Sequence, residues 1–239
     1  MFSKIYKKSE ITFALIWIAI YVIIMNIALQ FCNGFDHLDT KTIPQLLVPV
    51  ICITIIAFLS TLFILKNNLK TYYGLQQFKS DYKTYLFFIP LILMSCINLY
   101  AGFALQAPLP QSLLMMTNLA IGGYVEEIIF RGFLFKAMAK DNIHTAILVS
   151  AITFGVGHIV NLANTQDTFG VLLQVCYAIA VGFLYTILVY KSNSLYPCII
   201  SHMFVNGTSV FSSSQTSIYS SLFIIIISLT YAYYLYKKA

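Results

Sequence analysis

The chain has 239 residues, of which 59% are hydrophobic and only 9% are charged, and its mean hydropathy is +0.83. Charged residues make up about a quarter of an ordinary soluble domain, so this composition excludes a soluble globular protein and predicts an integral membrane protein. The formal net charge of +6 lies mainly in the loops between apolar runs, which indicates contact with anionic lipid and not with nucleic acid.

About eight apolar runs are long enough to cross a hydrocarbon core about 30 Å thick, which takes about 20 helical residues. In chain order the expected spans are about Ile11–Phe31, Gln45–Leu65, Leu86–Leu105, Ser112–Phe135, His144–Leu162, Gly170–Tyr190, Leu195–Phe211 and Ile218–Tyr236. We therefore predict an all-α fold, a polytopic membrane helix bundle in which residues 1–239 form a single domain.

The basic residues assign the loops to sides of the membrane. Twelve of the fourteen Lys and Arg residues fall on one side of the expected spans: Lys4, Lys7, Lys8, Lys66, Lys70, Lys79, Lys83, Lys136, Lys140, Lys191, Lys237 and Lys238. Lys41 lies on the other side, and Arg131 lies inside a span. Because cytoplasmic loops carry the excess of positive charge, this alternation predicts an even number of spans with both termini in the cytoplasm.

Two of the eight acidic residues, Glu126 and Glu127, fall inside spans, where they form the string EEIIFR with Arg131. An ionisable side chain at the bilayer centre costs at least about 2.5 to 3.5 kcal/mol, so these three residues need partners or a function. Residues four apart share a helix face, so we expect a salt bridge between Glu127 and Arg131. Glu126 has Phe130 four residues on, which leaves its carboxylate available for general acid or base chemistry.

A histidine ends the string FGVGH in the fifth expected span. His158 shares a helix face with Phe154, because the two are four residues apart. The glycines between them, Gly155 and Gly157, permit a close approach of another helix.

A second histidine lies in the seventh expected span. His202 and Asn206 are four residues apart and point into the same space. Residue counts from the lysine-rich end of each span place Glu126, His158 and His202 at depths of roughly 10 to 20 Å. We therefore expect these groups to converge in a cavity that opens toward the cytoplasm.

Several known routes to peptide hydrolysis inside a membrane lack their residues in this sequence. The zinc-protease motif H-E-x-x-H and the serine motif G-x-S-x-G do not occur. An aspartyl pair is excluded because every aspartate falls in a tail or loop. The remaining route is activation of water by a glutamate and a histidine.

The three strings together resemble the CPBP intramembrane proteases, a family named for CAAX proteases and bacteriocin-processing enzymes and also called the Abi family. The family pattern is E-E-x-x-x-R, then F-x-x-x-H, then H-x-x-x-N or D, on successive membrane helices. This chain has all three in that order and in separate spans. The resemblance covers about residues 112–211, the expected catalytic core, and residues 1–105 are expected to supply N-terminal transmembrane helices.

The resemblance implies an intramembrane glutamic endopeptidase, similar to the type II CAAX prenyl endopeptidases. The catalytic residues that it implies are Glu126, His158, His202 and Asn206, and the supporting residues are Glu127, Arg131 and Phe154. The first glutamate and first histidine would activate a water molecule, and the second histidine and the asparagine would stabilise the oxyanion. No cofactor is expected. Zinc stays open as an alternative, although an asparagine amide is a poor zinc ligand.

Two other functions remain open at this point. The same cavity could bind a peptide without cleaving it, as in a bacteriocin-immunity or peptide-signalling regulatory protein, or its ionisable residues could relay protons in a coupled transporter. The expected substrate is a membrane-associated peptide or protein, and the compact form of the chain resembles bacterial members, which predicts a bacterial plasma membrane. Neither prenylation of the substrate nor the oligomeric state has a signature in the sequence.

Overall fold

The computed structural model describes residues 2–34, 36–76, 88–100, 102–213 and 218–237. Within these ranges the chain is helical, with an isolated β-bridge between Phe103 and Ser212. The elements are α1 (Phe2–Lys8), α2 (Glu10–Phe31), η1 (Leu38–Thr40), α3 (Ile43–Lys66), α5 (Ile89–Ser95), α6 (Ile97–Tyr100), α7 (Leu109–Glu126), η3 (Glu127–Leu134), α8 (Phe135–Met138), α9 (Ile143–Gly157), η4 (His158–Ala163), α10 (Thr168–Ser192), α11 (Tyr196–Ser209) and α12 (Ile218–Lys237). The predicted all-α fold is confirmed.

Six helical stretches of the described chain are long and apolar enough to cross a membrane. They are Glu10–Phe31, Ile43–Lys66, Leu109–Met138, Ile143–Ala163, Thr168–Ser192 and Ile218–Lys237, and each coincides with a predicted span. The other two predicted spans, Leu86–Leu105 and Leu195–Phe211, correspond to shorter helices, namely α5 with α6 and the 14-residue α11; residues 86, 87 and 101 lie outside the described ranges. The count of eight and the side of the termini stay predictions.

Side-chain caps fix where three of the long helices begin. Ser9, Asn142 and Asp167 each accept a hydrogen bond from the backbone N–H three residues further on, at 3.1, 2.9 and 2.8 Å. A helix leaves its first N–H groups without intrahelical partners, and the membrane interior offers no water to satisfy them. The caps therefore place the starts of α2, α9 and α10 at positions where the sequence supplies an acceptor.

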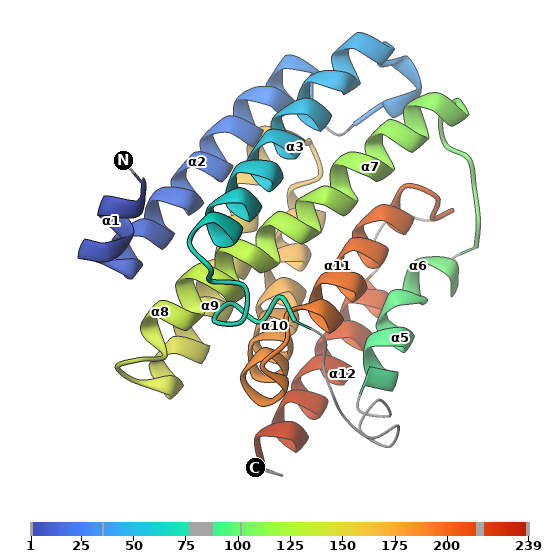
Figure 1. Ribbon diagram of the computed structural model, residues 1–239. Helices are drawn as coiled ribbons and strands as arrows, with labels where there is room; N and C mark the ends of the chain where they lie inside the picture. Colours follow the sequence, from blue (N-terminus) through green and yellow to red (C-terminus); the bar gives the residue numbers. More distant parts are fainter. Residues whose placement is uncertain (1, 35, 77–87, 101, 214–217, 238–239) are drawn as a thin grey trace.

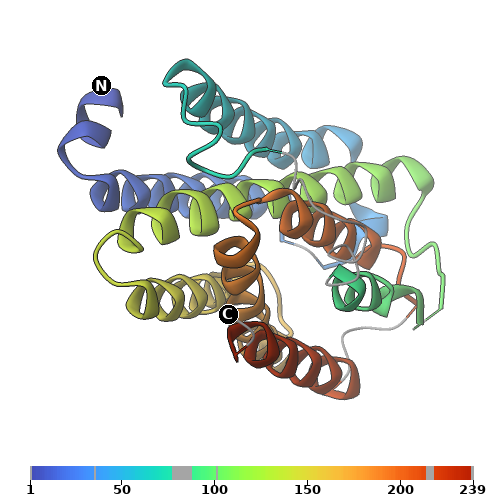
Figure 2. The same ribbon diagram turned by 60° about the horizontal axis from the view of Figure 1, so that its bottom comes forward.

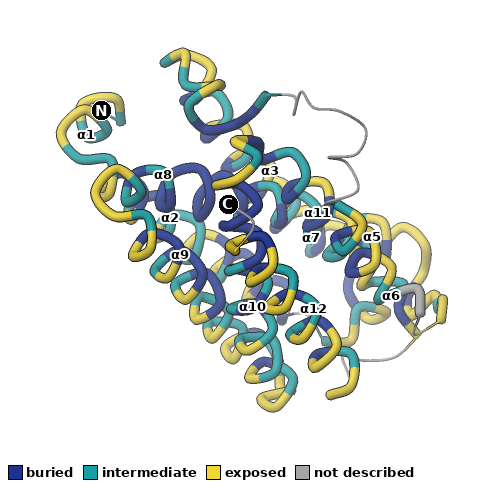
Figure 3. The backbone as a smooth tube through the Cα atoms, turned by 90° about the horizontal axis from the view of Figure 1, so that it is seen from below, coloured by how far each residue is buried: buried dark blue, intermediate teal, exposed yellow. Residues whose placement is uncertain are grey.

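Two rows of helices form the bundle. The helices α2, α3 and α7 lie side by side in one row (Figure 1), and α10 packs between α9 and α12 in the other, as Figure 2 shows. The shorter α11 packs against α7 and α5. Buried residues face the inside of this arrangement and exposed ones its outside (Figure 3), where large apolar side chains such as Ile27 and Phe58 are 64% and 62% exposed, as expected of a surface that contacts lipid.

Small residues allow α9 and α10 to approach closely. A Cβ atom at Gly155 would lie 2.6 Å from the backbone nitrogen of Ile179, and one at Gly182 would lie 2.9 Å from the Cα atom of Ala151. The close approach that the glycines permit is therefore found at Gly155. At Gly157 no atom lies within 4 Å of the Cβ position, and the helix changes there from α9 to η4.

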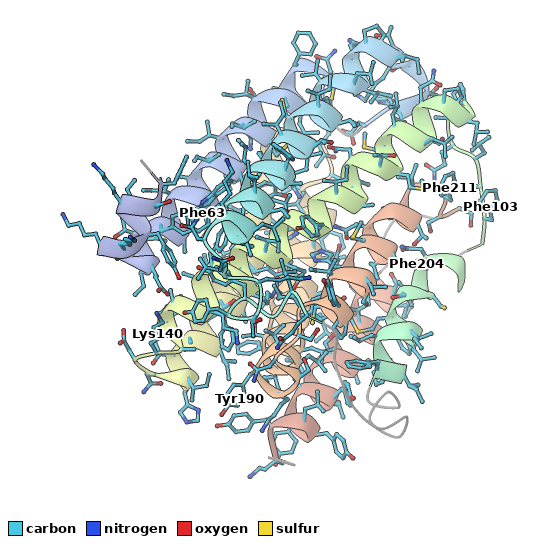
Figure 4. All side chains as sticks on the ribbon, in the orientation of Figure 1. Phe63, Phe103, Lys140, Tyr190, Phe204 and Phe211 are labelled. Carbon is cyan, nitrogen blue, oxygen red and sulfur yellow. The ribbon has the colours of Figure 1, made fainter. Side chains whose placement is uncertain are left out.

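The two ends of the bundle differ in chemistry. One end carries Lys140, whose Nζ lies 2.7 Å from Glu10 Oε1, together with Tyr190 and both chain termini (Figures 1 and 4). At the other end the rings of Phe103 and Phe211 stack with centroids 5.5 Å apart (Figure 4). We call these the lysine-rich end and the lysine-poor end; the latter also contains the end of α2 and the starts of α3 and α7.

Candidate active site

The two glutamates lie at a junction between two kinds of helix. Glu126 is the last residue of α7, and Glu127 is the first residue of the π-helix η3. π-helical segments are rare in proteins, and those that occur are often found at functional sites. Every residue of η3 is buried, whereas the side chain of Glu126 is 12% exposed. The neighbouring carboxylates therefore have different surroundings.

Glu127 forms the predicted salt bridge with Arg131, with 3.0 Å between Glu127 Oε1 and Arg131 Nη1 and both side chains fully buried. The guanidinium carbon of Arg131 also lies 4.0 Å from the centroid of the Phe154 ring, and a desolvated cation–π contact contributes about 2 kcal/mol. Two further nitrogens of Arg131, Nε and Nη2, have no hydrogen-bond partner among the described residues. The ring of Phe154 thus supplies stabilisation where hydrogen bonds are lacking.

Glu126 finds its partners on two other helices. The hydroxyl of Tyr21, on α2, donates a 2.6 Å hydrogen bond to Glu126 Oε1. The Nε2 atom of His202, on α11, lies 3.3 Å from Glu126 Oε2, a distance suited to an ion pair although the geometry of a hydrogen bond is not met. Both oxygens of the carboxylate are therefore held from outside α7, as expected for an acid without a charged partner on its own helix.

His202 lies between the two glutamates. Its Nδ1 atom is 2.8 Å from Glu127 Oε1, while Nε2 faces Glu126. A neutral imidazole has one N–H, so both contacts are favourable only when the ring is cationic or one carboxyl carries a proton. If the ring is cationic, the two negative charges of the glutamates are balanced by the two positive charges of His202 and Arg131. A Cβ at Gly123 would lie 3.1 Å from the backbone of His202, so this glycine permits the close contact of α7 with α11.

His158 begins the 3₁₀-helix η4 beside this cluster. Its Nδ1 atom lies 3.0 Å from the carbonyl oxygen of Phe154. A carbonyl only accepts hydrogen bonds, so Nδ1 carries the hydrogen, and in the neutral ring Nε2 is an acceptor. The ring of Phe154 makes edge contacts with both histidines, with centroids 5.0 Å from His158 and 5.7 Å from His202.

A cavity of about 130 Å³ is lined by four of the seven predicted site residues. Glu126, His158, Asn206 and Phe154 line it, whereas His202 lies behind Glu126 and is not part of the wall. A larger apolar groove of about 440 Å³ lies between α9, α10 and α12 and contains neither glutamate. The candidate site is therefore the smaller cavity, which holds the ionisable groups.

This cavity extends toward the lysine-poor end of the bundle. Its walls include the second half of α2, the part of α7 that precedes Glu126, and η4 with the first part of α10, whereas α3 contributes Ile53 from near its middle. On the lysine-rich side of Glu126, aromatic rings fill the space between helices: Phe133 lies 5.0 Å from Phe13 and 5.9 Å from Trp17, centroid to centroid. These rings occupy the lysine-rich side of Glu126 among the described residues, and the predicted opening of the cavity toward the cytoplasm stays a prediction.

The described residues contain few side chains placed to bind a metal ion. No group of three or more His, Cys, Asp or Glu side chains is arranged there to hold an ion. Apart from Glu126 and His158, the polar side chains of the cavity wall are carboxamides, such as that of Asn206, and the hydroxyl of Tyr21, which zinc sites rarely use as ligands.

Sequence reasoning missed Tyr21, which makes the shortest contact to Glu126. Its hydroxyl is a polar group in the otherwise aliphatic string IAIYVIIM, a weak signal, since tyrosines are numerous in this chain. It also missed the amide side chains of the cavity wall, such as Asn161 and Gln174. Their common position becomes visible only when α2, η4 and α10 are brought together.

Part of the chain that forms this site matches a known protein family. Residues 108–208 match the family described as type II CAAX prenyl endopeptidase Rce1-like. This segment is Rce1-like. The resemblance to CAAX proteases is thereby confirmed for the part of the chain that contains all four predicted catalytic residues, while the Rce1-like segment excludes Tyr21 and the whole of α1, α2 and α3. A comparison with curated proteins finds no match.

Proposed function

We propose that the chain is an intramembrane endopeptidase that hydrolyses peptide bonds of membrane-associated peptides or proteins with water activated by Glu126 and His158. The observation that carries this proposal is the half-buried carboxylate of Glu126, held by Tyr21 and His202 at the wall of a cavity that also presents His158 and Asn206. The Rce1-like match supports a CAAX-type protease, and the helix bundle supports an enzyme in the lipid bilayer.

In the proposed reaction Glu126 acts first as a base and then as an acid. A water molecule between Glu126 and His158 is oriented by the unprotonated Nε2 of His158 and loses a proton to the Glu126 carboxylate. Its oxygen adds to the peptide carbonyl carbon, and the carbonyl oxygen becomes an oxyanion. The C–N bond then breaks, and the proton on Glu126 passes to the leaving nitrogen, which yields a carboxyl group and an amine.

Stabilisation of the oxyanion is assigned to Asn206 and His202. The side-chain amide of Asn206 provides N–H donors in the cavity wall. A preorganised donor of this kind lowers the activation free energy by about 2.7 to 4 kcal/mol. His202 would add a second bond when its Nε2–H turns from Glu126 to the oxyanion. Until then it orients the carboxylate, and Glu127 with Arg131 holds His202 in place.

The direction in which the cavity extends bears on how the substrate enters. We propose that the substrate enters from the bilayer or from the lysine-poor end, since the cavity extends in that direction. With both termini cytoplasmic, as the basic residues predict, that end faces away from the cytoplasm. Fusion of a reporter to a loop at the lysine-poor end tests this orientation.

Comparative peptidomics tests the proposed activity without a known substrate. Membranes from cells that express the wild type or Glu126→Gln are compared for peptides that end at a new, shared cleavage position. The proposal expects such peptides with the wild type alone. Asp39→Asn is the matched control, because it also changes a carboxylate to a carboxamide, at an exposed residue of the short 3₁₀-helix η1, and should leave the peptide pattern unchanged. Retained biological function without cleavage in Glu126→Gln would favour the non-catalytic regulatory alternative.

A further inference from the structure

Six carboxamide side chains line the small cavity: Asn26, Asn118, Asn161, Asn164, Gln174 and Asn206. Burying an amide without a hydrogen-bond partner costs about 1 to 3 kcal/mol in proteins, so a set of this size inside a membrane bundle needs an explanation. Glu126 and His158 are the ionisable side chains of the wall apart from Tyr21. Away from these, the cavity offers neutral donors and acceptors.

Three of the lining residues form a row along η4. A 3₁₀-helix has three residues per turn, so side chains three apart lie above one another on one face. His158 is the first residue of η4, Asn161 lies three residues on, and Asn164 caps the helix three residues later. At about 2.0 Å rise per residue, the row is spaced at about 6 Å and leads from the proposed catalytic histidine toward the lysine-poor end.

Each asparagine of the row is paired with an amide from another helix. Asn161 Nδ2 donates to Gln174 Oε1 at 2.9 Å, and Asn164 Nδ2 donates to Asn26 Oδ1 at 3.4 Å. A carboxamide has an acceptor oxygen and two donor hydrogens, so every such pair keeps one unused acceptor and at least one unused donor, whichever way the amides are turned.

One of these unused acceptors is buried. Asn164 is only 6% exposed, and its Oδ1 has no hydrogen-bond partner among the described residues. The same holds for Oδ1 of Asn118, which is 4% exposed and lines the cavity from α7. Unsatisfied buried acceptors at a cavity wall are available to water or to a ligand that brings N–H donors.

The main chain of an extended peptide fits this arrangement. Each peptide unit has one N–H donor and one carbonyl acceptor, which matches what an amide pair leaves free. In an extended strand, every second residue faces the same side, at a repeat of about 6.6 Å. This repeat is close to the spacing of about 6 Å along the η4 row, so successive amide pairs can meet alternate residues of one strand.

We propose that the row Asn161 and Asn164, backed by Gln174 and Asn26, is a subsite that binds the main chain of an extended substrate on one side of the scissile bond. This rests on the proposed function, which places the scissile bond beside Glu126 and His158. The subsite recognises the backbone and not side chains, so it selects an extended, uncharged segment and tolerates varied sequence. The contact at Asn161 falls two residues from the scissile bond, and the contact at Asn164 falls four residues from it.

The test measures binding apart from cleavage. The probe is a fluorescent peptide that contains a cleavage position found by peptidomics or, failing that, a farnesylated peptide that ends in a CAAX sequence, and the protein is Glu126→Gln in nanodiscs. N-methylation of one peptide bond at a time removes one N–H without changing a side chain. The subsite predicts affinity losses of about tenfold at alternate positions on one side of the scissile bond and losses of less than about twofold at the positions between them.

Asn161→Leu in the Glu126→Gln background links the pattern to the subsite. This substitution should lower the affinity for the unmodified peptide by about tenfold. It should also abolish the effect of N-methylation at the peptide bond that Asn161 contacts. Gln30→Leu is the control, because Gln30 also donates to Asn26 Oδ1, at 3.3 Å, but does not line the cavity; it should leave affinity within about twofold.

The outcomes separate the subsite from the proposed function. Equal affinity of all N-methylated peptides, or the same pattern in Asn161→Leu as in its parent, overturns the subsite, and the peptide series does so even if a variant does not fold. An alternating pattern together with uncut peptide in the wild type supports the subsite and refutes the endopeptidase.

Discussion

Replacement of Tyr21 by Phe removes the hydroxyl that donates the 2.6 Å hydrogen bond to Glu126 Oε1 and leaves the ring in place. Hydrogen bonds to charged groups contribute about 1.5 to 3 kcal/mol. Without its donor the carboxylate is a stronger base, which offsets part of this loss. A reacting group displaced by about 1 Å, however, can cost about 100-fold in rate. We therefore expect kcat to fall by about 10- to 100-fold while KM changes less than about threefold.

The assay is steady-state cleavage of an internally quenched peptide by protein in nanodiscs. Tyr124→Phe is the matched control, because its hydroxyl is also hydrogen-bonded between helices, to Thr61, at 2.5 Å, without contact to either glutamate. The control should retain kcat within about twofold. Equal losses in both variants, or an unchanged kcat in Tyr21→Phe, would refute the role of Tyr21 in positioning Glu126.

Three further outcomes follow from the same contacts. Arg131→Met leaves Glu127 buried without its partner, so the free energy of unfolding, measured by SDS titration, should fall by about 3 to 5 kcal/mol; a loss below about 1 kcal/mol would contradict the buried salt bridge. Asn206→Ala removes an oxyanion donor, so kcat should fall by about 10² to 10³ with little change in KM, whereas a change in KM alone would assign Asn206 to substrate binding. A chelator should leave cleavage unchanged, and loss of activity that zinc restores would show that a metal takes part.

Local features of the site were predictable from the sequence. The salt bridge of Glu127 with Arg131 and the contact of Phe154 with His158 are both four residues apart, so helix geometry alone places these side chains together. The six long spans followed from apolar run length, since a bilayer fixes the number of residues that must be apolar. These inferences needed no knowledge of how the helices pack.

Features that depend on packing between distant segments were not predictable. Tyr21 and Glu126 are 105 residues apart in the chain, and no local pattern pairs them. The π-helix after Glu126 has no signature in the string EEIIFR, and it replaces the regular α-helix assumed for the two glutamates. The direction of the cavity depends on how rings such as Phe133 fill the other side, which depth counts along single spans cannot show.

The central claim is that the carboxylate of Glu126 carries out peptide hydrolysis. Its most direct test is the single-turnover rate of purified wild type, Glu126→Gln and Asp39→Asn in nanodiscs on a peptide found by comparative peptidomics. The claim predicts that the wild type and Asp39→Asn cleave one peptide bond at equal rates. Glu126→Gln should still fold and bind the peptide but lose at least about 10²-fold in rate, since a general base contributes about 10² to 10⁴. Cleavage by Glu126→Gln at the wild-type rate would contradict it.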